Sequence, residues 1–145
     1  MDVREYKCVL IIDNELSVGF IANVSSILSI TLGSKIQGLI GPDVTDREGV
    51  VHQGLTRLPI PVLGTTSNNI RMIRQEFLIK KTDTSFLVDF SSFAQQARTY
   101  EEYQSGIEAA ETNDIIYLGI ALFGDKKSIN KATKGLALIG NDRIK

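Results

Sequence analysis

Three apolar runs are the strongest pattern along the chain, and each one predicts a buried strand. Cys8 to Ile12, Phe86 to Asp89 and Ile115 to Leu122 contain few polar side chains. Strands that are apolar on both faces belong in the middle of a sheet that helices cover on both sides. We therefore predict that these three runs form the central strands of one sheet.

The segments between these runs supply the covering helices. From Gly19 to Leu32 and from Asn68 to Lys80, apolar residues recur three and four positions apart, as on the buried face of a helix. Gly33 is suited to end the first of these helices. Shorter helices are predicted at Ser91 to Ala97, Tyr100 to Ala110 and Asp125 to Lys134.

Short extended segments complete the pattern. Ile36 to Ile40 and Leu136 to Ile139 are each long enough for a short strand, and the two prolines within Leu58 to Leu63 favour an edge strand. Asp43 to Gly54 is rich in turn formers and predicts a surface loop or a small hairpin. Because strands alternate with helices, we predict a three-layer α/β sandwich, with a mixed, mostly parallel sheet of four to five strands and helices on both faces.

Length and composition narrow the class of protein. The 145 residues are expected to form one α/β domain, residues 1–145. The residues after Met1 lack the pattern of a secretory signal, and no apolar run reaches the roughly 18 residues of a spanning helix. The single Cys8 can form no internal disulfide; it is either a small apolar core residue or a reactive thiol, and we favour the core. These features predict a cytoplasmic protein without a membrane partner.

The charge is small overall but unevenly distributed. A net charge of −1 is lower than that of a general polyanion binder. The segment from Asp125 to the end, however, holds six basic residues against two acidic ones. This segment is either a solvated face or a local anion site. The six basic residues are Lys126, Lys127, Lys131, Lys134, Arg143 and Lys145.

No complete catalytic motif is present. The chain has no Gly-rich dinucleotide loop, phosphate loop or nucleophile elbow, so no cofactor is expected. One Cys and one His cannot form a Cys/His metal site. Asp13, Asp89 and Asp114 flank strand ends, where carboxylates hold Mg²⁺ in other proteins; we assign them turn and cap roles and predict no metal.

Candidate site residues gather after the first strand. Asp13, Asn23 and Ser25 follow its carboxyl end, where open α/β sheets bind ligands. Asp89 ends another predicted central strand, so Asn23 and Asp89 are expected to share one cleft at that edge. The alternative is that Asp89 caps the following helix. His52 is either a solvated loop residue or an acid or base at the rim of the cleft.

The order of short motifs resembles a bacterial family of unknown function, the domain-of-unknown-function 2000 family. The match extends over nearly the whole chain. It comprises Lys7, Glu15-Leu16, Gly19, Ala22-Asn23, Gly41-Pro42-Asp43, His52-x-Gly54, Pro61-Val62, Asp89-Phe90, Ala94-Gln95, Ala97 to Tyr100, Tyr103, Tyr117-Leu-Gly119, Ala121-Leu122, Gly124, Asn130 and Lys131-Ala-Thr133.

A more distant resemblance is to the type-two peptidyl-tRNA hydrolases. It rests on Lys7, Glu15-Leu16, Gly19 and Ala22 near the start, and on the segment from Ile129 to Leu136 near the end. It implies a fold like that of those enzymes. Asp89 matches that family's core aspartate, and Arg98-Thr99 match its Gly-x-Thr if residues 90–97 are an insertion.

Several positions depart from the hydrolase pattern. Phe20-Ile21 replace two lysines, Asn23 replaces a glutamine, Ser26 replaces a histidine and Asn130 replaces an aspartate. The lost lysines would contact phosphate, so tRNA is expected to bind weakly and in a salt-sensitive way, and true peptidyl-tRNA hydrolysis is the least favoured activity.

Two classes of function remain open. One is a hydrolase-like enzyme with an altered substrate, in which Asn23 orients a carbonyl or a water, Asp89 is the base or positions it, and His52 is an acid or base. Lys7, Asp13, Ser25, Arg98, Thr99 and Asn130 would then bind the substrate. The other is a non-catalytic module that binds a small molecule or a protein; a homodimer is compatible with either.

Overall fold

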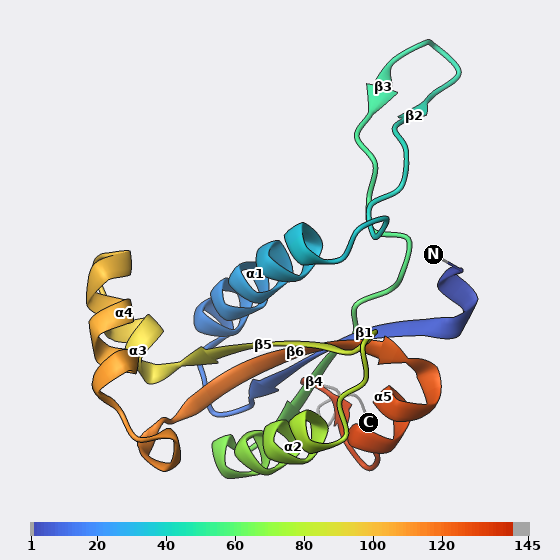
Figure 1. Cartoon of the computed structure of the whole chain (residues 1–145). Coiled ribbons are helices and arrows are strands. Elements are labelled where there is room, and N and C mark those ends of the chain that lie inside the picture. The colour runs from blue at the N-terminus through green and yellow to red at the C-terminus, as the bar shows by residue number, and fades with distance from the viewer. Residues whose placement is uncertain (1, 141–145) are drawn as a thin grey trace.

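A mixed five-stranded sheet lies at the centre of the computed structural model, which describes residues 2–140 (Figure 1). The strand order is β5-β6-β1-β4-β7. The strands are β1 (Tyr6–Asp13), β4 (Val62–Thr65), β5 (Phe86–Ser91), β6 (Tyr117–Asp125) and β7 (Ala137–Leu138). The helices are α1 (Val18–Lys35), α2 (Ser67–Ile79), α3 (Ser92–Gln96), α4 (Tyr100–Ala109) and α5 (Lys126–Ala132), with 3-10 turns at Val3–Glu5 and Thr112–Asp114.

The prediction of a mostly parallel sheet is wrong. Only β1 and β4 are parallel; β6 is antiparallel to both β1 and β5, and β7 is antiparallel to β4. The error came from taking the alternation of strands with helices as a sign of parallel crossover connections. Here β1 and β6 are apolar because helices cover both faces of the sheet, whatever the strand direction.

Two opposite helical layers bury the sheet (Figure 1). On one face, Val24 and Leu28 of α1 pack with Leu10 of β1 and Phe90 of β5. On the other face, α2 and α5 cover a second cluster. Its buried members are Val9, Ile11, Ile70, Phe77, Ile115, Tyr117, Ile120, Leu122 and Ile129. The predicted covering of both faces is therefore confirmed.

Helix α1 extends beyond the predicted end at Gly33. It continues to Lys35, although glycine is unfavourable within a helix. Leu32, next to Gly33, is fully buried, and its packing in the core outweighs this cost. By length and composition, α1 is the one helix among residues 2–140 that would suffice to cross a membrane. Only 17% of this helix is buried, at Val24, Leu28 and Leu32, which face the sheet.

Three predicted strands differ in the structure. Ile36 to Ile40 forms no strand, and only Ile40 makes an isolated bridge, to Thr56. The strand of Leu58 to Leu63 begins later, at Val62, and is not an edge, because β7 pairs along its outer side. Conversely, β5 was predicted to be central, yet it is an edge strand in the sheet.

The hairpin predicted between Asp43 and Gly54 is confirmed. Its two short strands, β2 (Val44–Thr45) and β3 (Val51–His52), pair only with each other. It projects away from the sheet on the side of α1 (Figure 1). The residues from Val44 to Gly54 are referred to below as the arm.

Candidate functional site

The structure does not assemble the site predicted from Asn23, Asp89 and His52. Asn23 is exposed on α1, which covers the face of the sheet that Phe90 contacts. Asp89, the neighbour of Phe90 along β5, points to the opposite face, where Arg74 of α2 binds it. Successive side chains of a strand face opposite sides of a sheet. The expected cleft shared by Asn23 and Asp89 is therefore wrong.

Asp89 instead forms part of a partly buried ionic cluster. Its Oδ2 accepts a hydrogen bond of 2.9 Å from Nε of Arg74. The guanidinium carbons of Arg71 and Arg74 lie 5.7 Å and 4.6 Å from the ring centre of Tyr117. Burial raises the pKa of Tyr117 above its ordinary value, as it does for Tyr103, and the Asp89 carboxylate acts in the same direction. These contacts join α2 to the sheet edge, which is a structural role.

The alternative role for Asp89, a helix cap, is also wrong. Helix α3 has Ser91 at its N-cap position, and no side chain caps it by a hydrogen bond. The Ser91 hydroxyl is buried and has no partner within residues 2–140. Asp89 lies two residues before this N-cap, and its carboxylate binds the guanidinium of Arg74 instead.

His52 lies in the arm and pairs with a residue of the arm itself. Its Nε2 is 2.9 Å from Oδ2 of Asp46, and both side chains are largely exposed. This contact, aided by backbone N–H groups of the turn, lowers the pKa of Asp46 below its ordinary value. Because the arm projects from the body, His52 is not part of a site with Asn23 or Asp89 (Figure 1).

Four further predicted binding residues have local partners or none. Oδ1 of Asp13 accepts the backbone N–H of Glu15 at 3.0 Å, which is the predicted turn role. Oγ of Ser25 is buried without a partner in the described part of the chain. Arg98 and Thr99 begin α4: Thr99 Oγ1 accepts from the backbone N–H of Glu102 at 3.1 Å, and Glu102 accepts from that of Arg98 at 2.8 Å. Thr99 therefore caps α4, and Glu102 binds the backbone of the residue that precedes the cap.

The remaining two predicted residues do meet. Lys7 Nζ on β1 donates a hydrogen bond of 2.8 Å to Oδ1 of Asn130 on α5. Both line a hollow of about 660 Å³ beside β1, whose other basic residues are Arg4, Arg57 and Lys126. Two of these cations already have partners, because Arg4 forms an ion pair of 3.0 Å with Asp2 and Lys7 binds Asn130.

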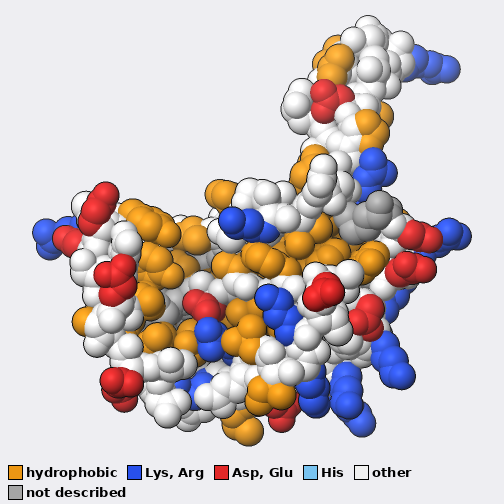
Figure 2. All heavy atoms as spheres, in the orientation of Figure 1, with side chains coloured by type: hydrophobic (Ala, Val, Ile, Leu, Met, Phe, Trp, Pro, Cys, Tyr) orange, Lys and Arg blue, Asp and Glu red, His pale blue; other side chains and the backbone are white. Residues whose placement is uncertain are grey.

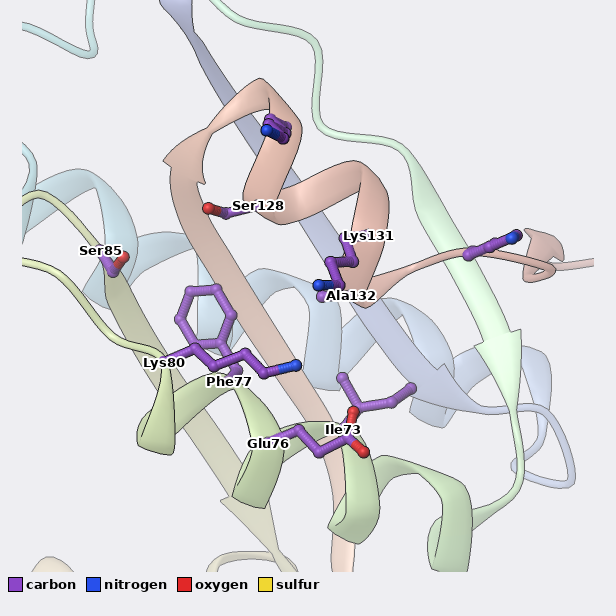
Figure 3. Close-up of a pocket in the computed structure, with 10 residues that line it drawn as sticks. Ile73, Glu76, Phe77, Lys80, Ser85, Ser128, Lys131 and Ala132 are labelled. Carbon is purple, nitrogen blue, oxygen red and sulfur yellow. The ribbon is translucent and has the colours of Figure 1, made fainter.

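A second hollow, of about 580 Å³, lies on the other flank of α5, between that helix and α2 (Figure 3). Phe77, Ile73 and Ala132 give it an apolar floor. Lysines surround this floor, with Glu76 as the one acidic residue of the lining. The lysines are Lys80, Lys127, Lys131 and Lys134, and the hydroxyls of Ser85 and Ser128 complete the lining.

The lysines of this α2–α5 pocket have no acidic partners. Within residues 2–140, no carboxylate oxygen lies within 4.0 Å of any of the four ammonium groups. Figure 3 shows Lys80 from α2 and Lys131 from α5 extending into the space between the two helices. Lys and Arg side chains also gather over this part of the surface in Figure 2. Like charges directed into one space repel each other, and a bound anion would relieve that repulsion.

The pocket matches one alternative from the sequence and adds a residue to it. Lys127, Lys131 and Lys134 belong to the basic C-terminal segment, for which a local anion site was considered. Arg143 and Lys145 of that segment lie outside the described residues. Lys80 was missed, because nothing in the sequence indicates that the end of α2 lies against α5.

The chemistry available in the pocket is binding rather than nucleophilic attack. The Ser128 hydroxyl donates to Oδ2 of Asp125 at 2.7 Å, in the N-cap arrangement that begins α5. The Ser85 hydroxyl lies 3.1 Å from that of Thr82. Neither hydroxyl has a histidine beside it as a base, and residues 2–140 contain no cluster of three His, Cys, Asp or Glu side chains suited to a metal.

Comparison with known proteins places the chain in a family. A family model described as "Protein of unknown function (DUF2000)" matches residues 6–139. This chain belongs to the DUF2000 family. No curated protein matches it. The likeness to type-two peptidyl-tRNA hydrolases stays a prediction that these comparisons do not test.

One solved structure of another protein shares the fold. It is the protein of unknown function Atu0240 from Agrobacterium tumefaciens strain C58, with a TM-score of 0.82 and 24% sequence identity. The match covers 92% of this chain and 97% of that chain. At this identity the likeness shows the fold alone.

Proposed function

We propose that this DUF2000 protein binds a small molecule that carries both an anionic group and an apolar group, in the α2–α5 pocket. The observation that carries the proposal is the set of four lysines around an apolar floor without a carboxylate partner in the described residues. A phosphate or carboxylate would contact the ammonium groups, while the apolar part would cover Phe77.

The charge supports this pocket over the hollow beside β1. In that hollow, the ammonium of Lys7 is engaged by Asn130 and the guanidinium of Arg4 by Asp2. Within residues 2–140 that leaves two cations of the hollow, Arg57 and Lys126, without a hydrogen-bonded or acidic partner, against four in the α2–α5 pocket. In the α2–α5 pocket, Lys80 and Lys131 are available to the ligand.

Hydrolase-like catalysis is a less well supported alternative. It relies on a base, an orienting amide and an acid in one cleft, and Asp89 and His52 each engage a different partner, Arg74 and Asp46. Action on tRNA has the further difficulty that α1 carries no lysine before Lys35, so the expected phosphate contacts are missing from its start.

Calorimetric titration with phenyl phosphate tests the proposal. Phenyl phosphate combines an anion with a ring, and inorganic phosphate and benzyl alcohol test each part separately. We expect phenyl phosphate to bind more tightly than either, with an affinity that falls as salt is added. Lys131→Gln and Lys80→Gln should each weaken it about tenfold, the loss of one charge-assisted hydrogen bond.

The matched control is Lys35→Gln, which removes an exposed lysine at the end of α1, on the other face of the sheet. It should leave the affinity for phenyl phosphate unchanged. Equal affinities of wild type, Lys131→Gln and Lys80→Gln, or no measurable binding by the wild type, would contradict the proposal.

A further inference from the structure

The arm exposes apolar side chains that its own chain does not cover. Val44 is 62% exposed, Val50 55% and Val51 56%, and Leu55 at its base is 81% exposed. An isolated two-stranded hairpin is marginal in water, and aliphatic side chains add no stability while they face solvent. The arm therefore has the composition of an element that another surface covers.

The arm is nevertheless a defined structure. Oδ1 of Asp46 accepts the backbone N–H groups of Glu48 at 2.9 Å and of Val50 at 3.0 Å, which fixes the turn. Gly49 has a φ of 87°, in the left-handed region that suits glycine. At the base, Oδ1 of Asp43 accepts from the backbone N–H of Gly54 at 3.0 Å. These bonds hold the valines in a fixed arrangement before any partner binds.

The outer face of α1 is a second uncovered apolar surface. Ile30 is 73% exposed, and Phe20 and Ile27 are each more than 40% exposed. No charged residue occurs in α1 before Lys35. Between the larger side chains the helix carries glycine, alanine and serine. A surface helix of a monomer normally presents charged residues to water.

These two surfaces lie on the same side of the molecule. The arm leaves the body just after α1 and projects on the side of the sheet that α1 covers (Figure 1). It extends away from its own α1 rather than folding back over it. The arm of one chain is thus placed to reach a molecule that faces α1.

We propose that this face binds a second copy of the same chain, with the arm of each protomer packed on α1 of its partner. In a two-fold symmetric dimer the contact between the arm of one protomer and α1 of the other occurs twice. One arrangement therefore covers both arms and both α1 helices. A different protein would need both a groove for the arm and a surface for α1, whereas this chain already carries both complements.

The available area fits a stable dimer. If a fully exposed aliphatic side chain presents roughly 100 Å², the exposed apolar residues of the arm, its base and α1 offer on the order of 500 Å². A standard interface buries about 800 Å² per partner, a little more than half of it apolar. The residues counted are Phe20, Ile27, Ile30, Ile40, Val44, Val50, Val51 and Leu55.

Light scattering tests the proposal by measuring the mass of the protein in solution. The measurement is made at about 100 μM chain, which is well above the Kd of a micromolar dimer. We expect a dimer for the wild type. Ile30→Asp on α1 and Val51→Asp on the arm should each raise the dimer dissociation constant about 100-fold or more, because each charge enters the interface twice. Ile79→Asp is the matched control: Ile79 is 83% exposed at the end of α2, on the opposite layer, and should leave the dimer intact.

Disulfide trapping tests which surfaces meet. A chain carrying both Ile30→Cys and Val51→Cys should give a covalent dimer under mild oxidation, and each single variant should give far less. Cys8 will not interfere, because it is fully buried. A monomeric wild type would overturn the proposal, and so would a dimer that resists both aspartate substitutions and fails to cross-link. If a monomeric wild type binds phosphatidylcholine vesicles, the α1 face is instead assigned to a membrane.

Discussion

Arg74 and Asp89 are joined by a hydrogen bond of 2.9 Å between Nε and Oδ2, and this bond ties α2 to the outermost strand of the sheet. Both side chains are only about one-fifth exposed, at 19% and 23%. The carboxylate is therefore committed to the guanidinium, which also lies over the ring of Tyr117. This relationship accounts for Asp89 without a catalytic role.

Asp89→Asn should lower the free energy of unfolding by about 1–2 kcal/mol, because it leaves a partly buried guanidinium without its counter-charge. Urea denaturation monitored by circular dichroism measures the change. Asp83→Asn, at an exposed loop position, is the control and should have almost no effect. If the two substitutions cost the same, the Arg74 bond contributes nothing to stability.

Cys8 should be unreactive in the folded protein. Its side chain is fully buried, and burial raises the pKa of its thiol from 9.0 to about 11. At pH 8 an aromatic disulfide reagent should modify the thiol only after urea is added. Rapid modification of the native protein would show that the strand β1 is open to solvent.

The same pKa difference makes stability depend on pH. Between pH 9.0 and about 11 the unfolded chain loses the Cys8 proton while the folded protein keeps it. The unfolded state binds fewer protons in this range, so the free energy of unfolding falls as the pH rises. Below pH 9.0 this contribution is constant. Comparing wild type with Cys8→Ala across this range isolates the effect from that of other groups; parallel pH profiles would contradict it.

Gly119 allows α1 to lie close to the sheet. A Cβ at this position would sit 2.9 Å from both Ile12 Cδ1 and Val24 Cγ1. Gly119→Ala should therefore destabilise the protein by about 1–2 kcal/mol through overpacking. Gly33→Ala, within α1 and with nothing within 4 Å of its Cβ, should instead stabilise it by about 0.5–1 kcal/mol. Thermal unfolding of the two variants should shift in opposite directions.

Gly54 closes the base of the arm. An added Cβ would lie 1.9 Å from the carbonyl oxygen of Gly41, a backbone atom that no side-chain rotation can move away. Gly54→Ala should therefore distort the arm and weaken the proposed dimer by at least about tenfold. Gly41→Ala, whose nearest contact would be an ordinary 3.4 Å to Leu55 O, serves as control. Light scattering on both variants distinguishes a specific effect of the arm from a general one.

The sequence was sufficient for the elements of the core but not for their directions. Local patterns were enough to predict β1, β6 and α2 close to their observed ranges. Apolar runs indicated the two strands, and helical spacing of apolar residues indicated α2. Pairing is different, because a run that is apolar on both faces carries no sign of its neighbour's direction. The placement of β6 between β1 and β5, antiparallel to both, could not be read from such runs.

Site predictions failed where they depended on that pairing. Asp89 shares a face with Leu87 and not with Val88 or Phe90, as strand alternation requires. Which face α1 covers was not encoded locally, so Asn23 and Asp89 were wrongly placed together. Lys7 and Asn130, 123 residues apart, were both named as binding residues, but no sequence pattern indicated their contact, and Lys80 had no signal at all.

The most direct test of the proposed function is to locate phenyl phosphate on the protein by ¹⁵N–¹H correlation spectra during a titration to about 10 mM, a range that detects millimolar binding. We predict that the amide signals of Phe77, Lys80, Ser128 and Lys131 shift together and saturate, and that in Lys131→Gln they reach a given shift only at about tenfold higher concentration of phenyl phosphate. Shifts confined to Lys7 and Arg57 in the hollow beside β1, or no saturating shifts anywhere, would contradict binding in the α2–α5 pocket.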